Sequence, residues 1–265
     1  MAEAGAPLLS VRNVGKTFGA LAAVKDLSFN VSEGEVLGIG GPNGAGKTTL
    51  FEVISGLSPA TSGTIAFAGQ DITRASPEAI CHAGIARTFQ LNAGFESMSV
   101  ADTVRLAAYF GRENRLMPGL SMGAGVEERV RDAIAVVGLA GREGVATSRL
   151  PVLERKLLML ASAIATAPRL LLLDEPVGGL NPKEIDQMMG LVRGLKTRGI
   201  TVILIEHVMR FLVQLASRVL IMHHGERIYE GSPAGLVRDR TVVDVYLGEG
   251  ASQRLSALLA AGAAP

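Results

Sequence analysis

Residues 41–48 of this 265-residue chain read GPNGAGKT, and they indicate its fold class. It matches the pattern GxxxxGK[ST], a glycine-rich loop whose backbone N–H groups converge on phosphate oxygens. Residues 35–40 (EVLGIG) predict a short apolar strand before the loop, and residues 48–56 (TTLFEVISG) show helical spacing with a glycine stop after it. A strand, this loop and a helix in direct succession are typical of proteins that bind nucleoside triphosphates.

Residues within the loop have distinct expected roles. Lys47 is expected to reach the β- and γ-phosphates, and Thr48 is expected to offer its hydroxyl to Mg²⁺. The helix N-terminus adds a partial positive charge. A dinucleotide-binding loop is excluded, because residues 38–40 (GIG) are followed at the last required position by Asn43 instead of glycine. The residues predicted to contact the nucleotide are Gly41, Pro42, Asn43, Gly44, Ala45, Gly46, Lys47, Thr48 and Thr49.

Acidic residues follow a second buried strand. Residues 170–173 (LLLL) form an apolar run that is too short for a helix and typical of a parallel strand buried on both faces. Asp174 and Glu175 come directly after it, and His207 ends the next predicted strand, residues 201–207. Ligands of α/β sheets bind at the carboxyl ends of the strands. We therefore expect Asp174 to hold Mg²⁺ through water, Glu175 to act as the base that orients the attacking water, and His207 to hydrogen-bond the γ-phosphate.

The order of the predicted elements indicates an α/β fold of the P-loop NTPase class with a mostly parallel core sheet. Residues 8–31 contain two alternating runs and residues 64–72 read as a hairpin, so an antiparallel β subdomain is expected. Helical periods broken by Gly and Pro predict a helical subdomain at about residues 91–149. It would be inserted in a single domain over residues 8–248. Residues 249–265 form an Ala-rich C-terminal tail in which we expect little tertiary anchoring.

Composition narrows the classes of partner. Twenty-six Lys and Arg against 25 Asp and Glu leave a formal charge of +1, which removes the main electrostatic argument for nucleic-acid or anionic-lipid binding. The single cysteine, Cys81, excludes an intrachain disulfide and fits a reducing compartment. The longest apolar run, residues 157–168, is shorter than the roughly 18 to 20 residues that a membrane span needs. We expect no nucleic-acid partner, no direct membrane insertion and a cytoplasmic location.

The motifs around these residues resemble those of ABC-type ATPases, the nucleotide-binding subunits of ABC transporters. The resemblance covers residues 8–248 and rests on FGALAAVKDLSF, GPNGAGKTTLFEVISG, RTFQ, DEPVGGLNPKE, IEHVM and VYLG. Within that superfamily, the sequences of these motifs are most similar to those of the ATPases of branched-chain amino acid importers. They also resemble those of urea-importer and lipopolysaccharide-exporter ATPases. The resemblance implies an ATP- and Mg²⁺-dependent ATPase that pairs with a second ABC ATPase subunit. It also implies transmembrane permease subunits as partners, at the inner face of the cell membrane.

The resemblance also implies roles for residues that spacing alone does not single out. Phe18 would stack on adenine, and Gln90, at the end of RTFQ, would sense Mg²⁺ and the attacking water. Asn181 stands where most of the superfamily has Asp, and it would contact the partner subunit. The helical subdomain, with Phe95 and Met98, would transmit dimer closure to the permease.

One motif departs from the family pattern. The signature, L-S-G-G-Q or a close variant, aligns without gaps to residues 150–154, which read LPVLE and lack the serine and both glycines. In the family this loop clamps the γ-phosphate held by the opposite chain of a head-to-tail dimer. Pro151 brings no N–H, and Glu154 brings a negative charge. Two interpretations stay open: an asymmetric heterodimer with a related ATPase, or a loop that still works through its backbone groups.

Other classes of function compete with a transport ATPase. The damaged signature also fits a regulatory nucleotide-binding subunit with weak hydrolysis. A soluble phosphotransferase or GTPase could use the same loop, but the chain has no N-K-x-D guanine motif. The transported solute is not readable from this chain, because substrate choice belongs to the permease and a binding protein.

Overall fold

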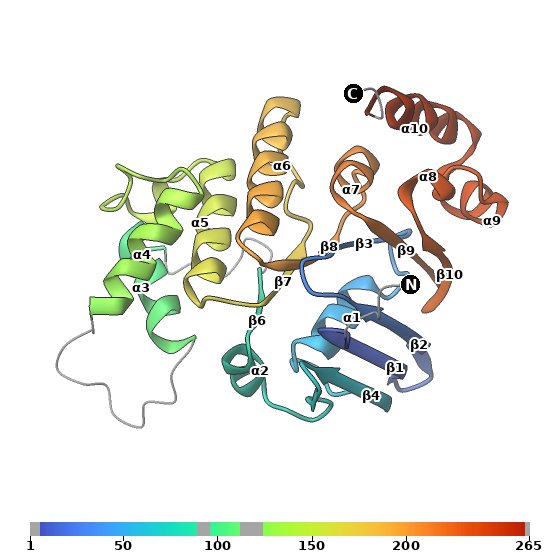
Figure 1. Cartoon of the computed structure of the whole chain (residues 1–265), viewed down its shortest axis with the longest axis horizontal. Helices are drawn as coiled ribbons and strands as arrows, with labels where there is room; N and C mark the ends of the chain where they lie inside the picture. Colours follow the sequence, from blue (N-terminus) through green and yellow to red (C-terminus); the bar gives the residue numbers. More distant parts are fainter. Residues whose placement is uncertain (1–5, 89–95, 112–123, 263–265) are drawn as a thin grey trace.

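The computed structural model describes residues 6–88, 96–111 and 124–262, and it contains a six-stranded and a four-stranded sheet (Figure 1). The strand orders are β10-β9-β3-β8-β7-β6 and β2-β1-β4-β5. The six-stranded sheet consists of β3 (Val36–Gly40), β6 (Ile85–Arg87), β7 (Leu170–Asp174), β8 (Thr201–Ile205), β9 (Arg218–His223) and β10 (Glu226–Gly231). The four-stranded sheet consists of β1 (Leu9–Phe18), β2 (Leu21–Val31), β4 (Ser62–Phe67) and β5 (Gln70–Asp71). The expected α/β class is thus confirmed.

The six-stranded sheet is parallel except at one edge. Its inner neighbours β9, β3, β8, β7 and β6 all pair in parallel, whereas β10 pairs antiparallel with β9. A two-residue turn joins β9 to β10, so the chain reverses there without a crossover helix. The second sheet is antiparallel throughout, as residues 8–31 and 64–72 predict.

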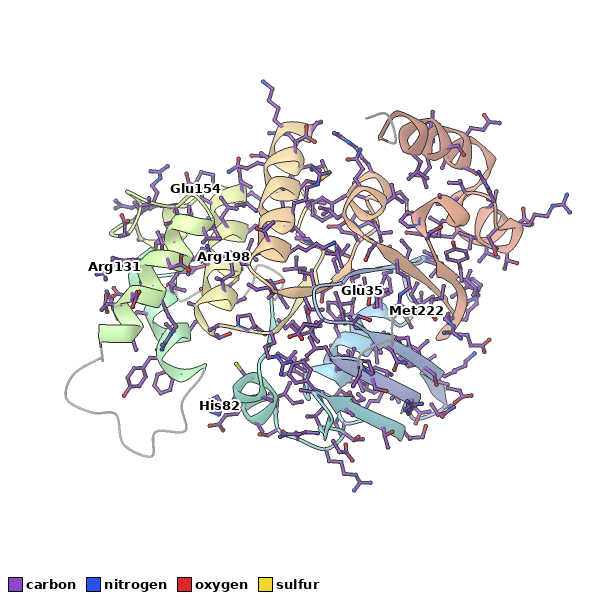
Figure 2. All side chains as sticks on the ribbon, in the orientation of Figure 1. Glu35, His82, Arg131, Glu154, Arg198 and Met222 are labelled. Carbon is purple, nitrogen blue, oxygen red and sulfur yellow. The ribbon has the colours of Figure 1, made fainter. Side chains whose placement is uncertain are left out.

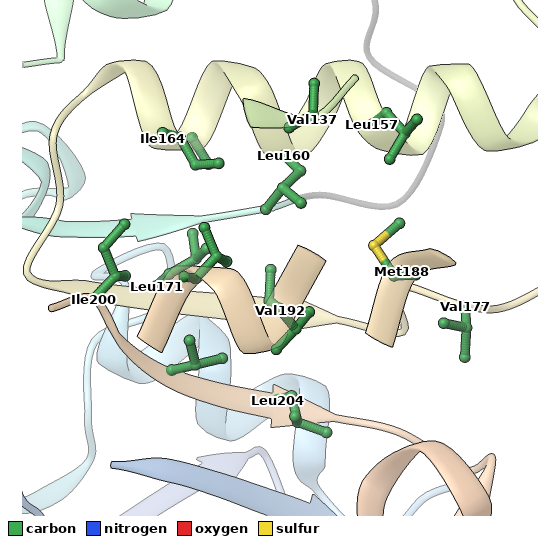
Figure 3. Close-up of a cluster of buried hydrophobic side chains, with 14 of the residues drawn as sticks. Val137, Leu157, Leu160, Ile164, Leu171, Val177, Met188, Val192, Ile200 and Leu204 are labelled. Carbon is green, nitrogen blue, oxygen red and sulfur yellow. The ribbon is translucent and has the colours of Figure 1, made fainter. Parts of the chain in front are cut away.

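Two hydrophobic cores lie on opposite faces of the parallel sheet, which explains the run of four leucines in β7. Leu171 and Leu173 join the core on the helix-covered face, whereas Leu170 and Leu172 join the core between the two sheets. Figure 3 shows the first of these cores, in which Leu157 and Leu160 of α5 point toward the sheet and Met188 and Val192 of α6.

Helices fill both sides of the parallel sheet. The helix α1 (Lys47–Ile54) lies between the two sheets with its apolar side chains buried (Figure 1). The other face carries α5 (Val152–Ala165), α6 (Pro182–Thr197) and α7 (Met209–Leu215), and α2 (Pro77–Ala83) precedes β6. Asn181 begins α6 with a capping box, because its Oδ1 accepts from two backbone N–H groups and Glu184 accepts from the Asn181 N–H.

A helical bundle stands at one end of the molecule (Figure 1). It contains α3 (Val100–Phe110), α4 (Ala124–Val136) and the single turn η1 (Thr147–Arg149), which overlap the expected helical subdomain. Residues 96–111 and 124–149, the described part of that segment, contain no strand. Both α3 and α4 pack on α5, so the helix that carries the divergent signature is shared between bundle and core.

The C-terminal part of the chain forms α8 (Pro233–Leu236), α9 (Arg240–Val242), the short π-helix η2 (Val243–Leu247) and α10 (Glu249–Gly262). The packing of α10 contradicts the expectation that the tail, residues 249–265, has little tertiary anchoring. Leu255 of α10 is only 5% exposed, and α10 packs on α7. The ring of Tyr246 lies beside Gly40, directly before the phosphate loop. The apolar face of the tail packs on α7, which lies some forty residues earlier in the sequence. The local sequence of the tail does not reveal this partner.

Candidate functional site

The phosphate loop lies where the carboxyl ends of the central strands meet. It follows β3, which lies between β9 and β8, and β7 is the next strand beyond β8. Asp174 ends β7, Glu175 follows it, and His207 stands just after β8. Because parallel strands end at the same edge, the loop and these three residues gather at one edge of the sheet. The sequence predicts this arrangement from the two strand-end motifs.

Two glycines let the loop fit between neighbouring strands. Gly41 has φ 143°, and a Cβ there would lie 2.2 Å from the carbonyl oxygen of Met222 in β9. Gly46 has φ 96°, and a Cβ there would lie 2.1 Å from the carbonyl oxygen of Ala23 in β2. Any side chain at either position would collide with backbone, so the loop requires glycine there.

Lys47 begins α1 and its ammonium is turned back onto the loop. Its Nζ donates hydrogen bonds to the carbonyl oxygens of Gly41 at 2.8 Å and Pro42 at 3.0 Å. Burial lowers the pKa of the Lys47 ammonium, while the nearby carboxylates of Glu175 and Asp174 act in the opposite direction. The Lys47 ammonium therefore lies near both the loop and the acidic strand end, where it could also form an ion pair with a phosphate group.

A cavity of about 720 Å³ opens beside the loop. It is lined by residues 43–49, by residues 20–23 and Lys25 at the start of β2, and by Glu175 and His224. The N-terminus of α1 faces this cavity with its backbone N–H groups, which favours a negatively charged group there. The arrangement suits a nucleoside triphosphate whose phosphates rest on the loop.

Asp174 is buried and paired with an arginine that sequence analysis did not single out. The Arg87 Nη2 atom of β6 donates to Asp174 Oδ2 at 2.8 Å, and the two side chains are only 7% and 4% exposed. Among the described residues, no hydrogen-bond partner reaches the other carboxylate oxygen, Oδ1, although it is buried. Such an oxygen fits a Mg²⁺ site, because Mg²⁺ binds through one or two carboxylates and keeps several of its waters. Thr48 is exposed at the start of α1, on the same edge.

Glu175 has an unusual backbone conformation for a non-glycine residue. Its φ is 46°, in the left-handed region. Its side chain lines the cavity and is partly exposed, and its Oε1 lies 3.9 Å from His207 Nδ1. That distance is too long for a hydrogen bond but brings the two predicted catalytic groups together.

The structure does not bring every predicted residue into this cavity. Phe18, expected to stack on adenine, is half-exposed at the end of β1 outside the lining, and Lys16 Nζ lies 4.8 Å from its ring centroid. Gln90 and Phe95 lie outside the described residues. Met98 lies in the bundle, where its carbonyl accepts from Thr147 N.

Sequence reasoning missed several residues of the site. His224 stands in the β9–β10 turn, and it lines the cavity with Leu21. Glu206 is fully buried next to His207, and Lys156 of α5 reaches the Glu175 carbonyl. A signal for Glu206 exists, since a lone carboxylate inside the apolar run of residues 202–207 is costly to bury without partners. Nothing local marks Lys156.

The divergent signature lies at the N-terminus of α5. Pro151 is the N-cap residue, and Val152 in the first turn is 49% exposed. Glu154 does not stand alone, because its Oε1 accepts from Arg142 Nη2 at 2.7 Å. Its charge is therefore paired with that of Arg142. Figure 2 shows Glu154 in the helical part, well away from Met222, which borders the phosphate loop.

Comparisons with known proteins agree with this geometry. The family described as ABC transporter matches residues 24–178. The chain belongs to the ABC transporter family. This ABC ATPase is 31% identical over 251 residues to the high-affinity branched-chain amino acid transport ATP-binding protein BraF of Pseudomonas aeruginosa. The aligned residues cover 92% of this chain and 98% of BraF. It is 36% identical over 231 residues to the sulfate/thiosulfate import ATP-binding protein CysA 2 of Chromobacterium violaceum, covering 87% of this chain and 60% of CysA 2.

Solved structures resemble the ABC ATPase over the same extent. A nucleotide-free ATP-binding cassette from an ABC transporter superposes with a TM-score of 0.83 at 28% identity, covering 92% of this chain and 100% of that one. The ADP conformation of an ATP-binding cassette superposes with a TM-score of 0.82 at 29% identity. The chain is thus the nucleotide-binding, ATP-hydrolysing subunit of a transporter. Within residues 6–88, 96–111 and 124–262, no helix combines the length and apolar character that crossing a bilayer requires.

Proposed function

We propose that this ABC ATPase drives an importer of branched-chain or related amino acids from the inner face of the cell membrane. The match to BraF carries the proposal, because it extends over 98% of BraF, whereas CysA 2 is matched over only 60% of its length. The motifs DEPVGGLNPKE, IEHVM and VYLG support the same subtype. A urea or lipopolysaccharide transporter is the alternative within the family.

The proposed nucleotide site uses the residues gathered at the sheet edge. The backbone N–H groups of residues 41 and 43–49 and the Lys47 ammonium bind the phosphates. Phe18, which lies outside the lining of the cavity, contacts the adenine. Thr48, Asp174 and Gln90 hold Mg²⁺, which when bound supplies positive charge to the phosphate oxygens. The buried Asp174 Oδ1 supports this assignment. Lys47 exchanges its loop carbonyls for phosphate oxygens when ATP enters.

Hydrolysis in this proposal depends on Glu175 and His207. The Glu175 carboxylate accepts a proton from the attacking water and aligns it with the γ-phosphate, while His207 donates a hydrogen bond to a γ-phosphate oxygen. The 3.9 Å separation of their side chains supports a shared substrate position between them. The catalytic contribution is mostly positioning and charge stabilisation.

The permease is proposed to dock on the helical side of the molecule. A groove of about 570 Å³ between α2, α3 and α5 has a mainly apolar lining. Leu106 and Phe110 line it, and Phe110 is 60% exposed. Exposed apolar side chains beside a groove are typical of protein interaction sites. This groove adjoins Arg87 through the neighbouring pocket, so docking there would reach the strand next to Asp174.

Uptake assays test the proposed substrate class. The ABC ATPase is reconstituted with its cognate permease and binding protein in vesicles, and uptake of labelled leucine, urea and sulfate is compared with ATP supplied on the side of the ATPase. We expect ATP-dependent uptake of leucine or a related amino acid. Uptake of urea or sulfate alone would contradict the proposed class while leaving the ATPase assignment intact.

We further propose that the chain pairs with a second, related ABC ATPase in an asymmetric heterodimer. Residues 150–154 present proline and apolar side chains where the family has serine and glycines, and Val152 exposes an apolar surface there. The phosphate loop of this chain would be completed by the signature of the partner, and the ATP of the partner would meet the divergent loop. Removing one preorganised donor from a developing charge costs about 100- to 1,000-fold in rate.

Single-turnover assays on the assembly test this asymmetry. The phosphate-loop lysine is disabled in each subunit in turn, with Lys47→Met in this chain. When the phosphate-loop lysine of the partner is disabled, we expect the assembly to keep most of its single-turnover rate. When Lys47→Met is introduced in this chain, we expect that rate to fall by about 100- to 1,000-fold. Equal residual rates at the two sites would rule the asymmetry out, and would indicate that the loop at 150–154 works through backbone groups.

A further inference from the structure

A fully buried carboxylate stands beside the catalytic edge without lining its cavity. Glu206 follows β8, immediately before His207, and its side chain is 0% exposed. Its Oε1 accepts from Val177 N at 2.9 Å, and its Oε2 accepts from His207 N at 3.1 Å and Val208 N at 3.2 Å. One side chain thus joins the segment after Glu175 to the segment that carries His207.

Burial makes this carboxylate costly. Desolvation raises the pKa of Glu206, and its three backbone donors oppose that effect only in part. A buried carboxylate is tolerated where backbone hydrogen bonds satisfy it, and those bonds in turn fix the positions of the groups that donate them. The backbone bonds of Glu206, which all lead to catalytic loops, therefore suggest a use beyond stability.

The segment that Glu206 reaches is strained. Glu175 has φ 46°, and non-glycine residues keep such conformations only where the surroundings determine them. Its N–H donates to the Ile205 carbonyl at 3.0 Å, and its carbonyl accepts from Gly178 N at 3.3 Å. The bond from Val177 N to Glu206 secures the next residues of the same turn.

A lysine from the neighbouring helix binds the same turn. Lys156 Nζ of α5 donates to the Glu175 carbonyl oxygen at 3.0 Å. Burial lowers the pKa of Lys156, and the carboxylates of Glu206 and Glu175 counteract that effect, so the ammonium lies within their field. The backbone of residues 175–177 is therefore bound by a half-buried cation, Lys156, and by a fully buried anion, Glu206.

We propose that Glu206 and Lys156 are positioning residues that hold Glu175 in its left-handed conformation and keep its carboxylate facing His207. Neither residue lines the phosphate cavity, so each acts through the backbone of another group. This inference rests on the proposed role of Glu175 as the base. Loss of either residue relaxes the turn and lets the Glu175 carboxylate move away from the attacking water.

The variants Glu206→Gln and Lys156→Met test this role with little change in volume. A glutamine keeps one acceptor oxygen and turns an NH₂ group toward backbone N–H donors, so the bonds of at least one oxygen are lost. We expect faster hydrogen–deuterium exchange at Val177, His207 and Val208 in the nucleotide-free full chain. In the transporter assembly we expect kcat to fall by about 100-fold, as for a catalytic group displaced by about 1 Å, with KM for ATP nearly unchanged.

The variant Thr201→Val is the matched control, because Thr201 stands at the opposite end of β8. Its side chain is also fully buried, and its Oγ1 accepts from Gly34 N at 2.9 Å. We expect it to lower the melting temperature while kcat stays unchanged. The variant Glu206→Asp, which keeps the charge, should recover part of the kcat lost in Glu206→Gln.

The outcomes separate this inference from the proposed function. If wild-type protein hydrolyses ATP and folded Glu206→Gln and Lys156→Met keep its kcat, the positioning role is overturned alone. It is also overturned if the loss of kcat equals that of Thr201→Val at the same loss of melting temperature. Should Glu206→Gln not fold, Lys156→Met decides by the same two readouts. Full turnover in folded Glu175→Gln would instead count against the assignment of Glu175 as the base, on which this inference rests.

Discussion

Replacing Glu175 by glutamine is expected to stop turnover and leave ATP binding intact. The amide keeps the size of the carboxylate, and the backbone bonds from Ile205, Gly178 and Lys156 do not involve the exchanged atom. What disappears is the basic oxygen that accepts the proton of the attacking water. A positioned general base contributes about 100- to 10,000-fold, so phosphate release should fall by that factor.

The measurement pairs steady-state phosphate release with fluorescent-nucleotide binding on the same Glu175→Gln preparation. Glu33→Gln serves as the control, because it is the same substitution at a different place. Glu33 forms an exposed ion pair with Arg169 near the amino ends of the strands. The control should retain wild-type turnover. Full turnover in Glu175→Gln would refute the assigned base and leave another group on this edge to be sought.

Replacing Lys47 by methionine is expected to abolish productive ATP binding. The side chain is buried, and methionine has a similar length and volume, so the fold should persist. Burial lowers the pKa of the Lys47 ammonium, so the charged form of this side chain is less favourable there than in water. The phosphates, however, lose a preorganised cationic donor, and kcat/KM for ATP should fall by about 100- to 1,000-fold.

Thermal unfolding and nucleotide titration together check the Lys47→Met prediction. The melting temperature of the variant without nucleotide should stay close to that of the wild type, while the stabilisation that added ATP gives the wild type should vanish. Lys196→Ala, an exposed lysine in the last turn of α6, is the control and should keep that stabilisation. Unchanged stabilisation by ATP in Lys47→Met would exclude a role of this lysine in binding.

Local sequence predicts the elements that carry short-range chemistry. The GxxxxGK[ST] spacing specifies a loop between strand and helix, because glycines at 41 and 46 are needed where backbone approaches backbone. The leucines of β7 specify a strand buried on both faces. Asn181 and Glu184 specify the start of α6 through a capping box.

Contacts between distant segments lie beyond that reach. Arg87 and Asp174 are 87 positions apart, and their pairing exists only because β6 and β7 are neighbours in the sheet. The packing of α10 on α7 and the hydrogen bond from Lys156 to the Glu175 carbonyl also join segments that are distant in the sequence. No pattern within one segment encodes which other segment it will meet.

Residue types at fixed local spacing specify the phosphate loop, the acidic strand end and the α/β class before any tertiary contact is known. Only folding brings Lys156 to the Glu175 carbonyl and Glu206 to the N–H of Val177 in the same turn. The tertiary structure also decides that Glu154 pairs with Arg142 and does not stand as an isolated charge. The reason is that burial and electrostatic pairing are properties of neighbours in space, which chain order does not specify.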